Sequence, residues 1–142
     1  MMLEKHVLDA KRLMMKEMED KDFYNQMCKL LRELFATYLE YKDLIKKQVI
    51  RTKLELRFFP HDRHIEEGLE FLEEKLKNKE DFIQVILSYM SSESAWLLKN
   101  CYLNNETKDM TEWYLKHFSK TTFYKKKKTA VLEFASYYLV LL

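Results

Sequence analysis

Four consecutive lysines, Lys125 to Lys128, form a concentrated patch of positive charge near the carboxyl end of the chain. Like charges repel one another, so such a run is either a solvated helix face or a surface for an anion. Ser119 precedes the run, and a serine there can cap a helix through its hydroxyl. The unpaired N–H groups and the dipole of a helix start favour a phosphate close to Ser119. The chemistry that this stretch suggests is therefore phosphate binding.

The helical repeat distributes the four lysines around the expected helix, so they cannot all contact one phosphate strand. With Phe123 on the buried side, Lys125 and Lys128 lie opposite it, while Lys126 and Lys127 lie at the flanks with their stems against the core. Lysine is a flexible point charge, so the hydroxyl-bearing residues are the expected carriers of any sequence preference. The residues expected to contact duplex DNA are Ser119, Lys120, Thr121, Thr122, Tyr124, Lys125 and Lys128.

No catalytic residue, metal site or cofactor is expected. The single glycine, Gly68, excludes a glycine-rich phosphate loop. The two cysteines, Cys28 and Cys101, have no evident base partner at a useful spacing, which favours a buried apolar role over that of a nucleophile. The stretch from His61 to His64 contains side chains that can bind metals, but no further histidine or cysteine lies nearby in sequence. We interpret it as a solvated loop.

The composition predicts an all-α fold. One Gly and one Pro among 142 residues leave few turn formers, and 47% hydrophobic residues suffice for a core. An apolar stripe at helical spacing predicts one long helix from about residue 22 to 52, preceded by a shorter one at about 3–19. In residues 53–59, Leu54, Leu56 and Phe58 alternate with charged residues. We interpret these residues as the end of the long helix running into an extended connector.

The expected organisation is an N-terminal helical region at 1–59, a connector at 60–64 around Pro60, and a C-terminal helical region at 65–142. Within the last region, a short helix at 111–117 and the helix that follows Ser119 give the outline of a helix-turn-helix, at about 94–139. Past Val131 the last helix is apolar on nearly all sides, so it needs cover from two directions. It either packs between the long helix and the helix that contains Trp96, or it forms the seam of a homodimer.

Several short motifs in the last part of the chain resemble a known family. They are Leu97 to Leu103, Trp113 to Leu115, Phe118-Ser119, Thr122 to Tyr124 and Lys127 to Ala130, with Ala130 eleven residues after Ser119. This pattern resembles region 4 of sigma factors and, more closely, the small ArpU-type phage transcriptional regulators, over about 45 residues. The residue usage also resembles that of small mollicute proteins from AT-rich genomes. The resemblance implies duplex DNA binding through the Ser119 helix, with RNA polymerase as a candidate further partner.

The resemblance has departures in the turn. His117 stands where the family usually has Gly or Asn, and Lys116 replaces a leucine, which here comes one position early as Leu115. A second hypothesis of a different class therefore stands beside DNA binding. It is a helical protein-interaction module, for example an adaptor associated with RNA polymerase, that uses the helix-turn-helix only as scaffold.

The charge distribution is uneven along the chain, and the cysteines indicate the cellular compartment. Formal net charge is +2, but seven lysines face two acids between Lys108 and Lys128, while seven acids face three lysines between Ile65 and Asp81. The two cysteines, Cys28 and Cys101, do not form a CxxC motif, and the sequence has no signal-peptide pattern. Both features predict a cytoplasmic protein with reduced thiols. Apolar stretches are too short to cross a bilayer, so no membrane association is expected.

Overall fold

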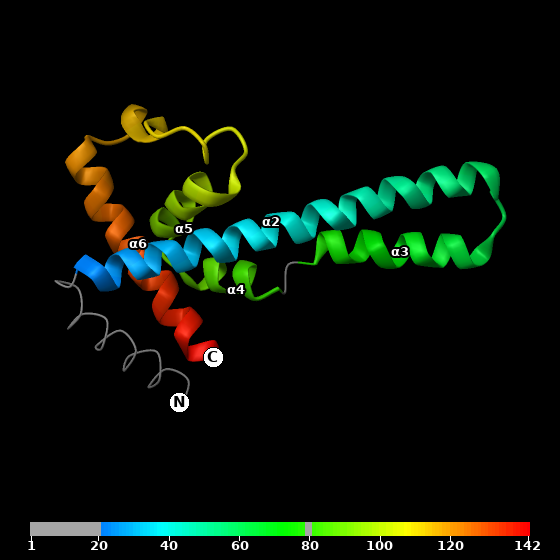
Figure 1. Cartoon of the computed structure of the whole chain (residues 1–142), viewed down its shortest axis with the longest axis horizontal. Helices are drawn as coiled ribbons and strands as arrows, with labels where there is room; N and C mark the ends of the chain where they lie inside the picture. The colour runs from blue at the N-terminus through cyan, green and yellow to red at the C-terminus, as the bar shows by residue number, and fades with distance from the viewer. Residues whose placement is uncertain (1–20, 79–80) are drawn as a thin grey trace. The chain divides into compact units, whose positions relative to one another are not determined.

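The computed structural model describes residues 21–78 and 81–142, and every regular element in them is helical. The predicted all-α fold with a long N-terminal helix is therefore confirmed, while the expected helix at about 3–19 lies outside the described residues. The chain forms two compact units (Figure 1). We call them the hairpin unit, Ala36–Asp81, and the main unit, whose described residues are 21–35 and 82–142. The expected connector at 60–64 falls within the hairpin unit.

The long helix α2 spans Lys21–Phe58, a length of 38 residues. The predicted change to an extended connector after residue 52 is wrong, because the helix continues through the alternating stretch. Leu56 is half-buried, whereas the side chains of Leu54 and Phe58 are 54% and 80% exposed. The helix here has apolar residues on two sides, and their superposition along the sequence imitates the period of a strand.

The hairpin unit consists of the second part of α2 and the antiparallel helix α3, Arg63–Lys77 (Figure 1). The Asp62 carboxylate accepts a hydrogen bond of 3.2 Å from the Ile65 N–H and caps α3. Salt bridges join Lys53 to Glu73 and Lys42 to Asp81, with N–O distances of 4.0 and 3.6 Å. The described residues of this unit bury only Ile45 and Val49, and α3 buries none of its residues.

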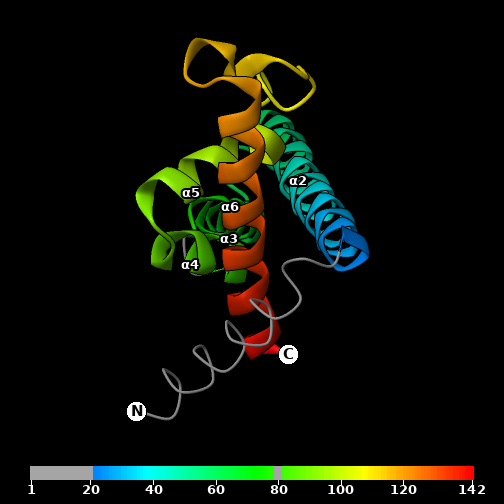
Figure 2. The same cartoon turned by 90° about the vertical axis from the view of Figure 1, so that its left-hand side faces the viewer.

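The main unit contains α4 (Phe82–Tyr89), α5 (Ser92–Leu98) and α6 (Lys120–Leu141) around the start of α2. Helix α6 has α4 and α5 on one side and the first turns of α2 on the other (Figure 2). The Phe134 ring lies 5.2 Å from that of Phe35 in α2. Buried residues of α6 are Phe123, Ala130, Val131, Leu132, Phe134, Ala135 and Ser136.

The apolar half of α6 therefore packs within its own chain, between α2 and α5, which is the first of the two alternatives. Leu132 lies opposite Phe123 by helical rotation and is nevertheless only 7% exposed, because α6 is covered from two directions. The residues left for a homodimer seam are at the end of the helix, where Leu139, Leu141 and Leu142 are exposed. The homodimer through α6 stays a prediction.

The segment before α6 differs from the expected short helix at 111–117. Helix α5 continues as a π-helical turn, Lys99–Leu103, and residues 104–112 then form a series of turns. A single 3-10 turn, Trp113–Lys116, follows without a side-chain cap. The fold thus places one short turn, and not an α-helix, directly before the helix that Ser119 begins.

Candidate functional site

The predicted start of the basic helix is confirmed in atomic detail. The Ser119 hydroxyl oxygen accepts a hydrogen bond of 3.3 Å from the Thr122 N–H and donates one of 2.9 Å to the Thr122 hydroxyl. Helix α6 begins at the next residue, Lys120. Six of the seven residues expected to contact DNA are exposed there: Ser119, Lys120, Thr121, Thr122, Tyr124 and Lys125.

Aromatic rings hold this helix start in place. The Tyr114 and Phe123 rings stack with centroids 3.9 Å apart and an interplanar angle of 4°. The Trp96 ring of α5 makes edge contacts with Trp113 at 5.5 Å and with His117 at 5.0 Å. Such ring pairs add to the free energy gained by apolar burial. The 3-10 turn is therefore fixed by contacts to both α5 and α6, since its own sequence supplies no cap.

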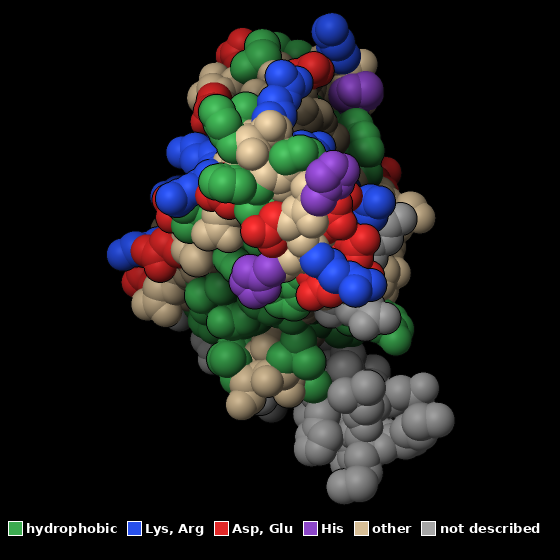
Figure 3. Space-filling model, turned by 90° about the vertical axis from the view of Figure 1, so that its right-hand side faces the viewer, with side chains coloured by type: hydrophobic (Ala, Val, Ile, Leu, Met, Phe, Trp, Pro, Cys, Tyr) green, Lys and Arg blue, Asp and Glu red, His purple; other side chains and the backbone are tan. Residues whose placement is uncertain are grey.

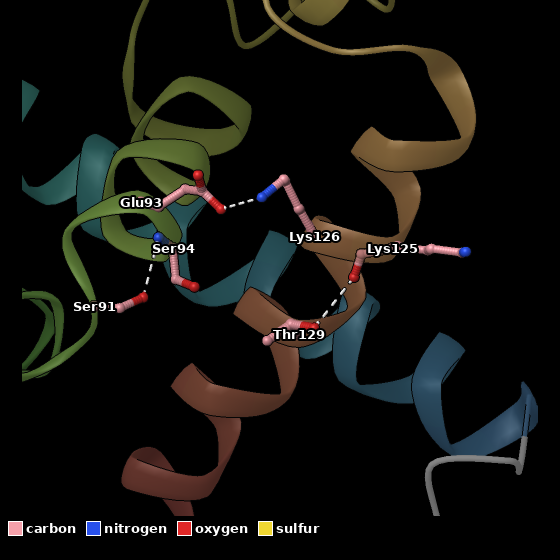
Figure 4. Close-up of polar contacts among 6 residues, drawn as sticks. All are labelled: Ser91, Glu93, Ser94, Lys125, Lys126 and Thr129. Atoms are coloured by element: carbon pink, nitrogen blue, oxygen red, sulfur yellow. Dashed lines mark hydrogen bonds and ion pairs between the residues drawn. The ribbon is translucent and has the colours of Figure 1, made fainter.

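Lys126 makes a tertiary contact instead of facing solvent alone. Its ammonium group donates a hydrogen bond of 2.5 Å to the Glu93 carboxylate in the first turn of α5 (Figure 4). It also lies 5.4 Å from the centroid of the Phe118 ring. Figure 4 shows Lys125 pointing away from this pair. Lys126 therefore joins α6 to α5, as the expected position at the flank allows.

Lys127 and Lys128 lie over tyrosine rings. The Lys127 ammonium is 6.0 Å from the Tyr102 centroid, and that of Lys128 is 5.7 Å from the Tyr24 centroid in α2. Both lysines are half-buried. Lys128, expected opposite Phe123 together with Lys125, is less exposed than Lys125 because the first turns of α2 pack against that part of α6. Its contact with DNA stays a prediction. The four lysines thus have different surroundings, and Lys125 alone among them is exposed.

A shallow hollow of about 230 Å³ lies between α5 and α6. Its lining residues are Glu93, Ser94, Leu97, Lys125, Lys126 and Thr129. The Ser94 N–H donates to the Ser91 hydroxyl oxygen at 3.3 Å, and the Thr129 hydroxyl donates to the Lys125 carbonyl oxygen at 3.2 Å (Figure 4). Because the Glu93 carboxylate and the Lys126 ammonium group pair with each other, Lys125 supplies the remaining charge of the lining, and Figure 4 shows its side chain pointing away from that pair.

Burial raises the pKa of three side chains in this part of the core, Cys101, Tyr102 and Tyr24. Burial raises the pKa of the Cys101 thiol to about 11, although the nearby Lys127 charge lowers it. Burial also raises the pKa of the Tyr102 hydroxyl, and the neighbouring Cys28 raises it further. The pKa of Tyr24 is raised by burial and by a hydrogen bond with the Cys28 side chain. These groups are neutral at physiological pH, which suits a core and not a nucleophile.

Two negative findings concern the described residues. Nowhere in 21–78 or 81–142 do three or more His, Cys, Asp or Glu side chains gather as metal ligands would. None of the helices described combines the length and the hydropathy that crossing a bilayer requires.

The sequence interpretation missed one surface. Seven large hydrophobic side chains of the hairpin unit are exposed: Tyr41, Leu44, Ile50, Leu54, Phe58, Phe59 and Phe71. The alternation of Leu54, Leu56 and Phe58 was its signal, since a helix with this pattern has apolar residues on opposite sides. Figure 3, which views the molecule toward the turn of the hairpin, shows hydrophobic side chains at the surface among basic and acidic ones.

The chain matches no protein family model, no curated protein and no solved structure at a significant level. The resemblance to sigma region 4 and to ArpU-type regulators therefore stays a prediction from the residues.

Proposed function

We propose that this protein is a helical protein-interaction module and that its hairpin unit is the arm that contacts a partner protein. The observation that carries the proposal is the poor burial of this unit. Its described residues bury two side chains, Ile45 and Val49, while seven large hydrophobic side chains are exposed. The stripe of α3 that faces α2 (Ile65, Leu69, Leu72 and Leu76) is only half-buried.

Two antiparallel helices alone enclose very little apolar surface, and stable helical units usually have a third or fourth helix over the shared face. Exposed apolar patches of this kind mark interaction sites in soluble proteins. The main unit, in contrast, buries residues from α2, α4, α5 and α6 around one core. A partner protein would therefore bury more apolar surface on the hairpin unit, whose hydrophobic side chains are exposed, than on the main unit, which already has a core.

The test is a pull-down from extract with and without nuclease. The hairpin variant carries Leu54→Glu and Phe58→Glu. The control carries Leu115→Glu, because Leu115 of the main unit is as exposed as Leu54. We expect a nuclease-resistant partner that the wild type and the control retain and that the hairpin variant loses. Equal retention by all three proteins, or loss of the partner on nuclease treatment, would refute the proposal.

Duplex DNA binding is a second candidate function, and the exposure of Ser119 to Thr122, Tyr124 and Lys125 favours it. The capped helix start and the lysines at 120 and 125 would face the phosphate backbone. A mobility-shift titration tests it with a Lys120→Glu and Lys125→Glu variant. The control is Lys99→Glu, at another exposed lysine of the main unit.

If DNA is the ligand, binding falls steeply with salt, the control variant binds normally, and the double variant loses binding. Equal mobility of DNA with the wild type and the double variant would exclude this function.

A further inference from the structure

We infer, on the basis of the proposed interaction function, that the outer side of α2 binds an amphipathic helix of another protein. The partner helix has Asp and Glu residues beside its apolar face. The site is the outer stripe, defined as Ile50, Leu54 and Phe58. These residues follow one another at intervals of four and so lie on one side of the helix. Their exposed fractions are 59%, 54% and 80%.

Helix α3 covers a different side of α2. The buried residues Ile45 and Val49 and the salt bridge from Lys53 to Glu73 mark the side that faces α3. Helix α2 thus has two apolar stripes, of which α3 covers one. A helix that is apolar on two sides is expected to be covered on both.

The outer stripe extends for about 12 Å along the helix axis, given a rise of 1.5 Å per residue. An amphipathic partner helix uses anchors at intervals of three and four over two or three turns. The stripe supplies one such set of anchor contacts, since Ile50, Leu54 and Phe58 span two turns.

The charges beside the stripe decide the kind of partner. Between Lys46 and Phe58 the chain has five basic residues and one acid, Glu55. That acid forms a salt bridge of 3.6 Å with Arg51, and the basic Lys53 is paired with Glu73. The remaining basic groups, on Lys46, Lys47 and Arg57, border the apolar side chains. Electrostatic complementarity therefore favours a partner with carboxylates at its rim.

The same charges disfavour a second copy of this chain as the occupant. Antiparallel pairing of two outer stripes about Leu54 would place Arg51 of one copy opposite Arg57 of the other. Parallel pairing would align identical basic residues. Like charges across an interface cost free energy, so self-pairing at this stripe is opposed.

The experiment is a selection of displayed helical peptides with randomised surface positions on the immobilised full-length protein. Parallel selections use Leu54→Glu, a Lys47→Glu and Arg57→Glu variant, and the control Leu115→Glu. Circular dichroism checks that each variant retains its helices. We expect the wild type and the control to enrich peptides with apolar anchors and acidic flanks. Leu54→Glu should bind them at least tenfold more weakly, and the variant at Lys47 and Arg57 should lose the preference for acids.

Peptides with basic flanks, equal binding to Leu54→Glu, or no enrichment over that variant would overturn the inference. Two further measurements exclude other occupants. A dimer in sedimentation that Leu54→Glu dissociates would assign the stripe to a second copy. Retention on vesicles with anionic lipid that the same variant abolishes would assign it to a membrane surface. A partner protein that the hairpin variant fails to bind, but that binds the wild type through a basic helix, would overturn this inference. The proposed function would remain intact.

Discussion

The Lys126 ammonium group and the Glu93 carboxylate lie 2.5 Å apart and join the second turn of α6 to the first turn of α5. A lysine in the centre of a four-lysine run thus has a structural partner. The side chains are 35% and 55% exposed, so solvent weakens the attraction. The pair contributes to the packing of the main unit without dominating it.

A double-mutant cycle measures this contact. We expect Glu93→Gln and Lys126→Met to show a coupling of about 0.5–1 kcal/mol in urea unfolding at low salt. Because the pair is partly exposed, the coupling should shrink in high salt. Additive effects of the two substitutions at low salt would show that the ion pair contributes nothing.

The stacked Tyr114 and Phe123 rings should account for much of the stability around the helix start. Phe123 is 4% exposed, so Phe123→Ala should lower the free energy of unfolding by about 3–5 kcal/mol. Tyr124, its neighbour in sequence, is 48% exposed and serves as the control, with an expected loss below about 1 kcal/mol for Tyr124→Ala. Equal losses in chemical denaturation would contradict the observed packing.

The buried Cys101 thiol should react slowly and should make stability depend on pH. In a Cys28→Ala protein, alkylation of Cys101 at pH 8 should be about a hundredfold slower in the folded than in the denatured chain. The reason is that its pKa rises from 9.0 to about 11, and each unit changes the thiolate fraction tenfold.

The sign of the pH effect follows from the same shift. The folded-state pKa lies above the unfolded value, so the stabilising contribution is complete below pH 9.0 and is lost as pH rises through about 11. The free energy of unfolding should therefore fall across this range, and less so in a Cys101→Ala protein. An identical alkaline decline in both proteins would exclude this thiol as a cause.

In the hairpin unit, alanine substitutions at two neighbouring residues of α2 should differ sharply in how much they destabilise the unit. Ile45 is 5% exposed and Leu44 is 59% exposed. Ile45→Ala should destabilise the unit by about 2–5 kcal/mol, whereas Leu44→Ala should cost below about 0.5 kcal/mol. Hydrogen exchange of the α3 amides reports this locally, since α3 is held by its contact with α2. Faster exchange in Leu44→Ala than in Ile45→Ala would mean that the two sides of α2 are wrongly assigned.

The sequence was sufficient to predict structural features that depend only on residues close together in the chain. The Ser119 cap and the helix that follows it require only a hydroxyl and the next three residues. The apolar stripe of α3, from Ile65 to Leu76, likewise follows from spacing alone. The all-α fold follows from composition, because the chain has one Gly and one Pro.

Features that depend on distant residues could not be predicted in this way. Lys128 lies over the ring of Tyr24, more than 100 positions away in the sequence, so helical rotation alone could not show that α2 covers it. The 3-10 turn at Trp113 is shaped by rings of α5 and α6. The alternation at Leu54 and Leu56 reflects two faces of one helix, which a single apolar period does not describe.

Photo-crosslinking tests most directly whether the hairpin unit contacts a partner. A benzophenone amino acid replaces Leu54 in one protein and Leu115 in another, since these leucines are 54% and 55% exposed in different units. After irradiation in cells, we expect a discrete protein adduct from position 54 and none of comparable yield from position 115. Adducts of equal yield from both positions, or none from position 54, would contradict this expectation.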